Sequence, residues 1–405
     1  MTTAEQARPH QSFARREAEF RPSPVRAVFE LAMRPEFVSL AGGNPDTSLL
    51  PHDLIADLSA QLLRERGAEI LQYGSGAGIA ALPESIAALM AAQGATVTAD
   101  NLLITTGSQM GLDLVTKLFC DPGDVVIGEG PTYVGAMGVF GSYEVDLRQV
   151  PTDDDGIDPE GVAELIDTVR AQRHPVKFVY VIPNYQNPTG VTLSEGRRRR
   201  LVQVCSARGI TIVEDDPYAH VGFQASPMLP SLYSMNPAGV IHLGSFSKLF
   251  SPGLRVGWMA APPAVRARLQ IAGEAVSIHP TVLAQELAHA YVSRPEWWQN
   301  LTIIRRSYQT RCEALLTALA KHLPDGVTWT TPRGGFFTWL TVAGVSPETD
   351  ILAAAIEHHL VIVPGNACYV RTPAACHIRL AYSNGTPDEF DEGTRRLAST
   401  LDSLR

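Results

Sequence analysis

The sequence predicts an α/β protein with a largely parallel sheet and a smaller α+β region after it. Between residues 100 and 260, short apolar runs alternate with segments of helical periodicity, as in consecutive β–α units. The run at 176–182 is almost continuously apolar, which is typical of a strand covered by helices on both faces. Beyond residue 262, long helical stretches are followed by short strands, and this change predicts the second region.

Strands of the first region are predicted over 102–105, 124–127, 176–182, 210–213, 240–243 and 256–260. A helix over 107–119 follows the first of them, because its apolar residues recur on one face. Another helix is predicted to begin near Ser194 and to be capped by Gly209.

The second region is predicted to open with helices between residues 263 and 321, broken near Pro280 and Pro295. Strands follow over 327–330, 335–342 and 378–381, with a helix over 351–359. Residues 1–40 are too polar and Arg-rich to fold alone, so we expect an arm that docks on the rest.

Composition excludes several classes of function. The 405 residues carry 33 Lys and Arg against 42 Asp and Glu, a net charge of −9 without a basic stripe, which argues against nucleic acid. The run from Arg197 to Arg200 is interpreted as a solvated helix face. The 5 cysteines form no C-x-x-C pair, so neither zinc nor a disulfide framework is expected, and free thiols suit a reducing compartment. No apolar run is long enough to span a membrane, and we expect a soluble, cytoplasmic protein.

The loop from Ser245 to Arg255, between two predicted strands, carries the clearest chemical signal. Lys248 is flanked by phenylalanine and leucine, and desolvation lowers the pKa of an ammonium group. A neutral amine is what Schiff-base chemistry requires. Ser245, Ser247 and Arg255 could hold a phosphate beside it.

Further candidates follow other predicted strands. Gly107-Ser108-Gln109 opens a helix, which suits either an anion site or an ordinary cap by Ser108. The segment 187–190 (NPTG) is a good turn. Glu214, Asp215 and Asp216 stand together at a strand end and could face a ring nitrogen, cap a helix or bind a metal, although no suitably spaced histidine supports a metal.

Two more residues have a functional and a structural interpretation. Tyr133 could belong to the core or stack on a ligand ring. Arg379 interrupts an apolar run and is either an outward residue or an anion fork, and we favour the fork. A dinucleotide-binding enzyme is rejected, because no G-x-G-x-x-G lies between a strand and a helix.

The ordered motifs resemble those of the fold-type I aminotransferases that use pyridoxal 5′-phosphate, in particular the branch of 2-aminoadipate and kynurenine aminotransferases. The segment S-F-S-K-x₆-R resembles the cofactor-lysine motif, and the resemblance extends from about Ser23 to Ser383. It implies a Schiff base between the cofactor and Lys248. No metal is expected, because no suitably spaced histidine accompanies the acids. It also implies a mostly parallel seven-stranded sheet in the large domain.

The resemblance implies a role for each candidate residue. The cofactor phosphate would lie among Ser108, Gln109, Ser245, Ser247, Arg255 and the neighbouring subunit's Tyr73. The cofactor ring would be held by Tyr133, Asn187, Asp215 and Tyr218, with Asp215 on the ring nitrogen because of its spacing to Tyr218. The substrate would be bound by Arg379, Asn187, Gly42, Ser23 and Arg26, although Arg26 could equally be an ordinary surface residue.

These implications predict a homodimeric aminotransferase that moves the α-amino group of an L-amino acid to a 2-oxo acid in a ping-pong reaction. Lys248 would act as the general base at the substrate Cα, supported by Asp215 and Tyr218. The alternatives are a lyase, decarboxylase or oxidase with the same cofactor, and a cofactor-sensing regulator. The predicted divisions are an arm (1–50) packing on the small domain and the active site, a large cofactor-binding domain (51–285) and a small domain (286–405).

Overall fold

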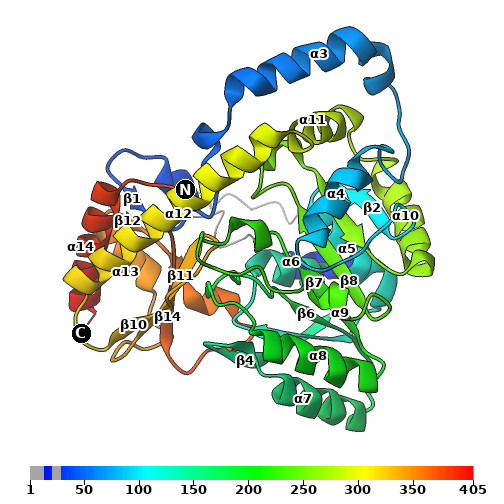
Figure 1. Cartoon of the computed structure of the whole chain (residues 1–405). Coiled ribbons are helices and arrows are strands. Elements are labelled where there is room, and N and C mark those ends of the chain that lie inside the picture. The colour runs from blue at the N-terminus through cyan, green and yellow to red at the C-terminus, as the bar shows by residue number, and fades with distance from the viewer. Residues whose placement is uncertain (1–12, 21–28, 405) are drawn as a thin grey trace, which may run out of the picture.

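The computed structural model describes residues 13–20 and 29–404, and its centre is one twisted sheet (Figure 1). The strand order is β2-β9-β8-β7-β6-β3-β4-β5. These strands are β2 (Leu102–Thr105), β3 (Val125–Gly130), β4 (Asp146–Asp153), β5 (Gly156–Ile157), β6 (Val176–Val181), β7 (Thr211–Asp215), β8 (Val240–Ser245) and β9 (Gly257–Ala260). The pairs from β4 through β3, β6 and β7 to β8 are parallel, whereas β9 is antiparallel to both of its neighbours.

The mostly parallel α/β sheet predicted from the sequence is confirmed, with one difference in strand number. All of the strands predicted in the first region are present within a few residues of their expected bounds. The expected seven strands are extended by β5, which has only two residues and pairs antiparallel with β4. Strand β4 was not predicted, because it alternates exposed and buried residues near the edge of the sheet and has no apolar run.

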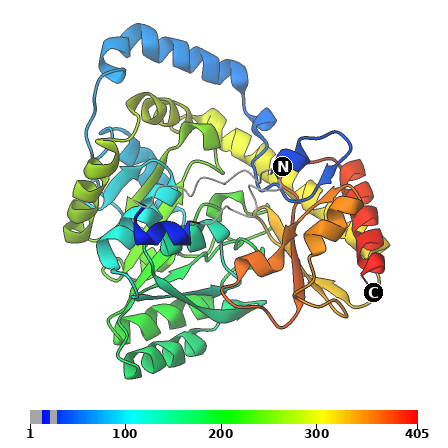
Figure 2. The same ribbon diagram turned by 180° about the vertical axis from the view of Figure 1, so that it is seen from behind.

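Helices flank the sheet in two packed groups (Figure 1). One group is α7 (Pro159–Ala171), α8 (Glu195–Ala207) and α9 (Leu232–Met235), and the other is α5 (Ser108–Phe119), α6 (Val134–Ser142) and α10 (Pro263–Ser277). Farther out, α3 (His52–Ile70) and α4 (Leu82–Ala91) pack on α11 (Val282–Val292). Seen from behind, η1 (Arg15–Glu19) lies against α6 (Figure 2).

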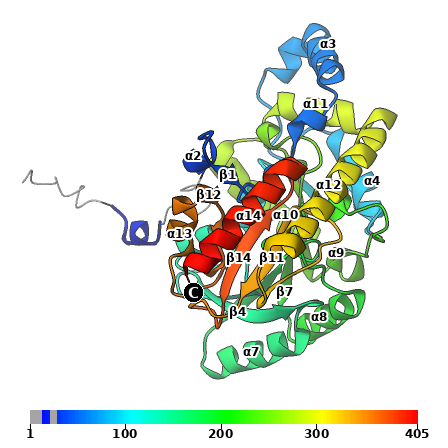
Figure 3. The same ribbon diagram turned by 90° about the vertical axis from the view of Figure 1, so that its left-hand side faces the viewer.

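The second region forms a four-stranded antiparallel sheet with the order β10-β11-β14-β13. Its strands are β10 (Val327–Trp329), β11 (Phe337–Val342), β13 (Val363–Pro364) and β14 (Cys376–Ala381). Its helices are α12 (Pro295–His322), α13 (Ile351–Glu357) and α14 (Pro387–Ser403). Helices α12 and α14 lie side by side across this sheet (Figure 3). The predicted strands, and the helix breaks near Pro280 and Pro295, are confirmed.

The N-terminal part joins this second region. Strand β1 (Val38–Ser39) pairs in parallel with β12 (Leu360–Val361), and α2 (Phe29–Ala32) and η2 (Thr47–Leu49) lie on either side of β1 in the sequence. The domain bounds 1–50, 51–285 and 286–405 stay predictions. Within the described ranges, no helix is both long and apolar enough to cross a lipid bilayer.

The interpretation of the run from Arg197 to Arg200 as a solvated face is wrong for one of its members. Arg198 is fully buried, because it lies on the same face of α8 as Leu201 and Val202, the face turned toward the sheet. Its guanidinium donates to the carbonyls of Leu193, Pro183 and Pro230 and to Asn184. The remaining arginines of the run pair with acids at the surface.

Candidate active site

The candidate site is a cavity of about 310 Å³ where the carboxyl ends of β7 and β8 meet the start of α5 and the second region. Open parallel sheets bind ligands at this edge. Predicted residues that line the cavity are Ser108, Gln109, Tyr133, Asn187, Asp215, Tyr218, Ser245, Ser247, Lys248, Arg255 and Arg379.

Lys248 supplies a buried amine to this cavity. It follows β8 in the short link to β9, where the buried side chains of Phe246, Leu249 and Phe250 fix the backbone. Its Nζ donates to the carbonyl of Gly43 at 3.1 Å. Burial, helped by the nearby charges of Arg379 and Arg255, lowers the pKa of Lys248 from 10.5 to about 8. At pH 7 roughly a tenth of the amine is therefore uncharged and nucleophilic, far more than for an amine at the ordinary lysine pKa.

One end of the cavity is built to bind an anion. Helix α5 begins at Ser108, and its cap residue is Gly107, so Ser108 is not the ordinary cap considered from the sequence. The backbone N–H groups of this first turn receive no capping side chain, and its residues Ser108 and Gln109 line the cavity, an arrangement that suits an anion. Ser245 donates to Ser247 at 2.9 Å, and the guanidinium of Arg255 donates to the same Ser247 oxygen at 3.3 Å.

Gly107 lies very close to the guanidinium of Arg255. Its φ is +79°, and a Cβ built on it would lie 2.4 Å from Nη2 of Arg255. Any other residue would have to displace the guanidinium from the start of the helix.

Asp215 lines the same cavity. Its Oδ2 accepts a hydrogen bond from the hydroxyl of Tyr180 at 2.7 Å, whereas its Oδ1 is buried without a partner. Burial raises the pKa of Asp215 to about 6, against the lowering effect of the Tyr180 hydrogen bond. An ionised carboxylate with one free, buried oxygen fits a cationic N–H donor such as a protonated pyridine ring.

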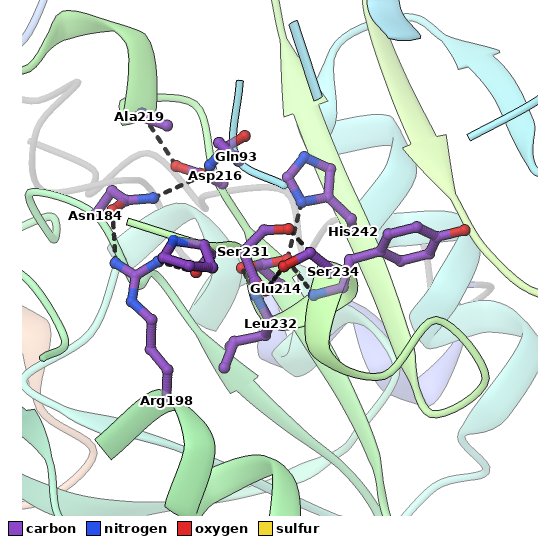
Figure 4. A network of polar contacts seen from close by, with 12 residues as sticks. Gln93, Asn184, Arg198, Glu214, Asp216, Ala219, Ser231, Leu232, Ser234 and His242 are labelled. Atoms are coloured by element: carbon purple, nitrogen blue, oxygen red, sulfur yellow. Dashed lines mark hydrogen bonds and ion pairs between the residues drawn. The ribbon is translucent and has the colours of Figure 1, made fainter. Parts of the chain in front are cut away.

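The two neighbouring acids are fully engaged elsewhere (Figure 4). Glu214 accepts from the amides of Leu232 and Tyr233 at 2.7 and 3.1 Å and pairs with Nδ1 of His242 at 3.0 Å. Burial by itself would raise the pKa of Glu214, but the hydrogen bond and charge of His242 lower it overall.

Asp216 accepts from three donors of its own (Figure 4). They are the side-chain amides of Gln93 at 2.5 Å and Asn184 at 2.8 Å, and the backbone N–H of Ala219 at 3.1 Å. Asp215 is therefore the acid of the three that faces the cavity with an oxygen to spare.

Arg379 and Asn187 contact each other in the wall of the cavity. The guanidinium of Arg379 donates from Nη1 to Oδ1 of Asn187 at 3.0 Å and from Nη2 to the carbonyl of Ala41 at 2.9 Å, and its Nε is buried without a partner. The ring of Phe337 lies 4.3 Å from its Cζ. Arg379 is therefore turned inward, as favoured from the sequence, and presents a fixed cation to the cavity.

Four of the predicted residues are not placed in the cavity wall. Gly42 does not line the cavity, whereas its neighbours Gly43 and Asn44 do. Tyr73 is 76% exposed, packs edge-on against His279 and lines a separate hollow. Ser23 and Arg26 lie outside the described residues.

The sequence analysis missed Tyr180 and Phe337. Tyr180 lies within an apolar strand, and nothing local to it indicates a partner 35 positions later. In the sequence, the pair Gly42-Gly43 indicates that another group approaches the backbone closely, but it does not identify that group. The structure identifies it as Phe337, because a Cβ at Gly43 would lie 2.5 Å from its ring.

The chemistry of this set fits pyridoxal 5′-phosphate. An anion site, a buried amine and an unpartnered carboxylate oxygen lie around one cavity, matching the phosphate, the aldehyde and the ring nitrogen. No group of three or more His, Cys, Asp and Glu that could hold a metal ion occurs in the described part of the chain.

Comparison with known proteins identifies the family. Residues 35–397 match the family model of aminotransferases of class I and II. The 2-aminoadipate transaminase of Thermus thermophilus is 35% identical over 97% of each chain. The aromatic-amino-acid aminotransferase 1 of Thermococcus litoralis is 34% identical over 94% of this chain and 91% of its own.

A solved structure agrees with these relatives. The kynurenine aminotransferase of Pyrococcus horikoshii, crystallised with PMP, superposes with a TM-score of 0.91 at 35% identity over 97% of each chain. These matches favour transamination over the lyase, decarboxylase, oxidase and regulator alternatives, and they confirm the resemblance to the 2-aminoadipate and kynurenine branch. The chain belongs to the class I and II aminotransferases and is a pyridoxal-phosphate-dependent transaminase of fold type I.

Proposed function

We propose that the transfer of the α-amino group between an L-amino acid and a 2-oxo acid takes place in the cavity around Lys248. The observation that supports this location is the buried amine of Lys248 in one cavity with the free oxygen of Asp215. Pyridoxal phosphate, when bound, supplies an aldehyde that takes up the amino group and a cationic ring that withdraws electrons from the substrate Cα.

The residues that line the cavity would bind the phosphate, hold the ring and move the proton. Ser108, Ser245, Ser247, Arg255 and Gln109 hold the phosphate. Asp215 would keep the ring nitrogen protonated, Tyr218 and Asn187 would hold the ring hydroxyl oxygen, and Tyr133 would lie against the ring. Lys248 would act as the general base that takes the proton from the substrate Cα and would carry it in the transfer.

Arg379 binds the substrate carboxylate. Its guanidinium is held by Asn187, Ala41 and Phe337, so little ordering remains to be done when the carboxylate arrives. The segment at 42–44 borders the same part of the cavity, with the carbonyl of Gly43 beside the lysine amine.

The experiment on Lys248 compares Lys248→Ala with Lys321→Ala, a change at an exposed lysine that pairs with Asp391. Borohydride should fix the cofactor covalently to the wild type and to the control, with the added mass on the peptide that contains residue 248. The Lys248→Ala protein should gain no such mass and should lose transaminase turnover by at least about 10⁴-fold. Full turnover in that variant would refute the assignment.

The substrate class follows from the relatives and from the N-terminal arm. The similar proteins are named for 2-aminoadipate, kynurenine and aromatic amino acids, so we propose donors with long side chains. Ser23 and Arg26 are proposed to bind the end of that side chain. Arg26→Ala should then raise KM for 2-aminoadipate and leave KM for alanine unchanged, and an equal effect on both donors would count against it.

The active form is proposed to be a cytoplasmic homodimer with sites shared between subunits. Tyr73 is exposed beside Leu71 at 68% exposure, on a surface that a second copy would bury. In the dimer Tyr73 would reach the phosphate of the neighbouring subunit.

Mixing two inactive variants tests the shared site. Lys248→Ala and Tyr73→Ala proteins, refolded together, should recover activity, because each mixed dimer contains one site with both residues intact. The absence of recovery, with mixed dimers demonstrated by mass, would show that each site is built from one chain.

A further inference from the structure

The hydroxyl of Tyr180 is the only side-chain hydrogen-bond donor that reaches Asp215 among the described residues. Tyr180 lies in β6, beside β7 in the sheet, where it is paired in register with Val213. Both Tyr180 and Asp215 are buried, and the 2.7 Å contact joins the phenol oxygen to Oδ2 of the carboxylate. A short hydrogen bond to a charged acceptor is strong and directional.

The ring of Tyr180 is fixed independently of this hydrogen bond. It is fully buried and packs edge-on against Phe140 of α6, with the ring centroids 5.5 Å apart. The phenol oxygen is therefore held at one point, and it determines which oxygen of Asp215 is engaged.

The consequence for Asp215 is an asymmetric carboxylate. Oδ2 is occupied by Tyr180, and Oδ1 is the oxygen without a partner in a residue that lines the cavity. We propose that Tyr180 is a positioning residue that holds Asp215 ionised, with Oδ1 turned toward the ring nitrogen of the cofactor. This inference rests on the proposed function.

The surroundings explain why Asp215 needs this hydrogen bond. Burial disfavours its charge, and the neighbouring carboxylate of Asp216 adds to that effect, while the cation of His242 partly offsets it. Glu129 of β3 lies close enough for its charge to be felt, but burial raises the pKa of Glu129 to about 8, which keeps it protonated. Loss of the phenol would therefore favour protonation of Asp215.

The experiment measures two dissociation constants for each protein at pH 7, below the pKa of Glu129 and above that of Asp215, using wild type, Tyr180→Phe and Tyr233→Phe. The ligands are pyridoxal phosphate and its carbocyclic analogue, in which a C–H replaces the ring nitrogen. Phenylalanine keeps the packing on Phe140, and Tyr233 of α9 is a second buried tyrosine that donates no hydrogen bond to Asp215. The readout is the ratio of the two constants, which a general loss of packing would not change.

Wild type should bind the analogue far more weakly than pyridoxal phosphate, because the analogue leaves the buried carboxylate unpartnered. In Tyr180→Phe this ratio should fall about tenfold, since Asp215 is neutralised more easily and no longer oriented. In Tyr233→Phe the ratio should equal that of wild type. An unchanged ratio in Tyr180→Phe would overturn the inference and leave the proposed function intact, whereas wild-type protein without a borohydride-reducible adduct would overturn both.

Discussion

Replacement of Arg198 by methionine should destabilise the protein more than any other change in the run from Arg197 to Arg200. The guanidinium of Arg198 is fully buried and donates four hydrogen bonds, to the carbonyls of Leu193, Pro183 and Pro230 and to Oδ1 of Asn184, at 2.6–2.9 Å. Methionine fills much of the same volume and donates none of them. The carbonyl of Leu193 and Oδ1 of Asn184 therefore lose this buried donor, whereas the carbonyl of Pro183 keeps the N–H of Leu193.

The expected cost follows from two opposing contributions. Each unsatisfied buried acceptor costs about 1–3 kcal/mol. Removal of the arginine also removes the cost of burying its charge, the effect that lowers the pKa of Arg198 against the attraction of Glu214 and Asp216. The balance resembles that for breaking a buried ion pair, about 3–5 kcal/mol. At roughly 2 °C per kcal/mol for a large domain, the melting temperature should fall by about 6–10 °C.

Arg200→Met on the same helix is the matched control. Arg200 pairs with Glu160 at the surface and its side chain is 51% exposed, so its replacement should leave the melting temperature unchanged. Thermal unfolding of the two variants and wild type, followed by near-UV circular dichroism with and without cofactor, gives the comparison. Equal melting temperatures for Arg198→Met and wild type would refute the conclusion that the buried hydrogen bonds of Arg198 stabilise the fold.

Other predictions concern the site itself. Gly107→Ala should weaken cofactor binding at least about tenfold, because its Cβ would lie 2.4 Å from Arg255. Gly123→Ala is the control, since Gly123 also has a positive φ but its Cβ would meet no atom, and it should leave binding unchanged in a fluorescence titration with the cofactor. The rate of cofactor capture by apoenzyme should rise with pH through about 8, the pKa of Lys248, because the neutral amine is the attacking form above that value; a rate flat across this range in stopped-flow absorbance would contradict it. Arg379→Leu should lower kcat/KM for amino acids about 100-fold or more and leave a related amine without a carboxylate unaffected in steady-state assays.

The features of this protein that could be predicted from the sequence are those that depend on residues close together in the chain. Strand 176–182 is visible because burial on both faces requires a continuous apolar run, and the loop at Lys248 is visible because its hydroxyls, lysine and arginine lie within a few residues. Helix α3 was not predicted, because only Leu58 and Ile70 of its residues are buried and its apolar face is correspondingly weak.

Features that depend on contacts between distant segments could not be predicted. Arg198 looks like its neighbours in the sequence, and only the packing of α8 on the sheet separates it from them. The contact between Tyr180 and Asp215 depends on the register of β6 and β7. The place of Tyr73 in a shared site depends on a second chain and stays a prediction.

The charges around Asp215 explain why this acid, among three in a row, suits a cationic ligand. Glu214 is compensated by His242, whose pKa is raised because its hydrogen bond and attraction to Glu214 outweigh burial. Asp216 is attracted by His242 and, less strongly, by Arg198, which is linked to it through the amide of Asn184 (Figure 4). The three buried carboxylates thus share two cations, and a further positive charge is best placed at the unpartnered oxygen of Asp215. A ligand that brings a proton on its ring nitrogen completes this balance, so cofactor binding should stabilise the fold more than the phosphate contacts alone can account for.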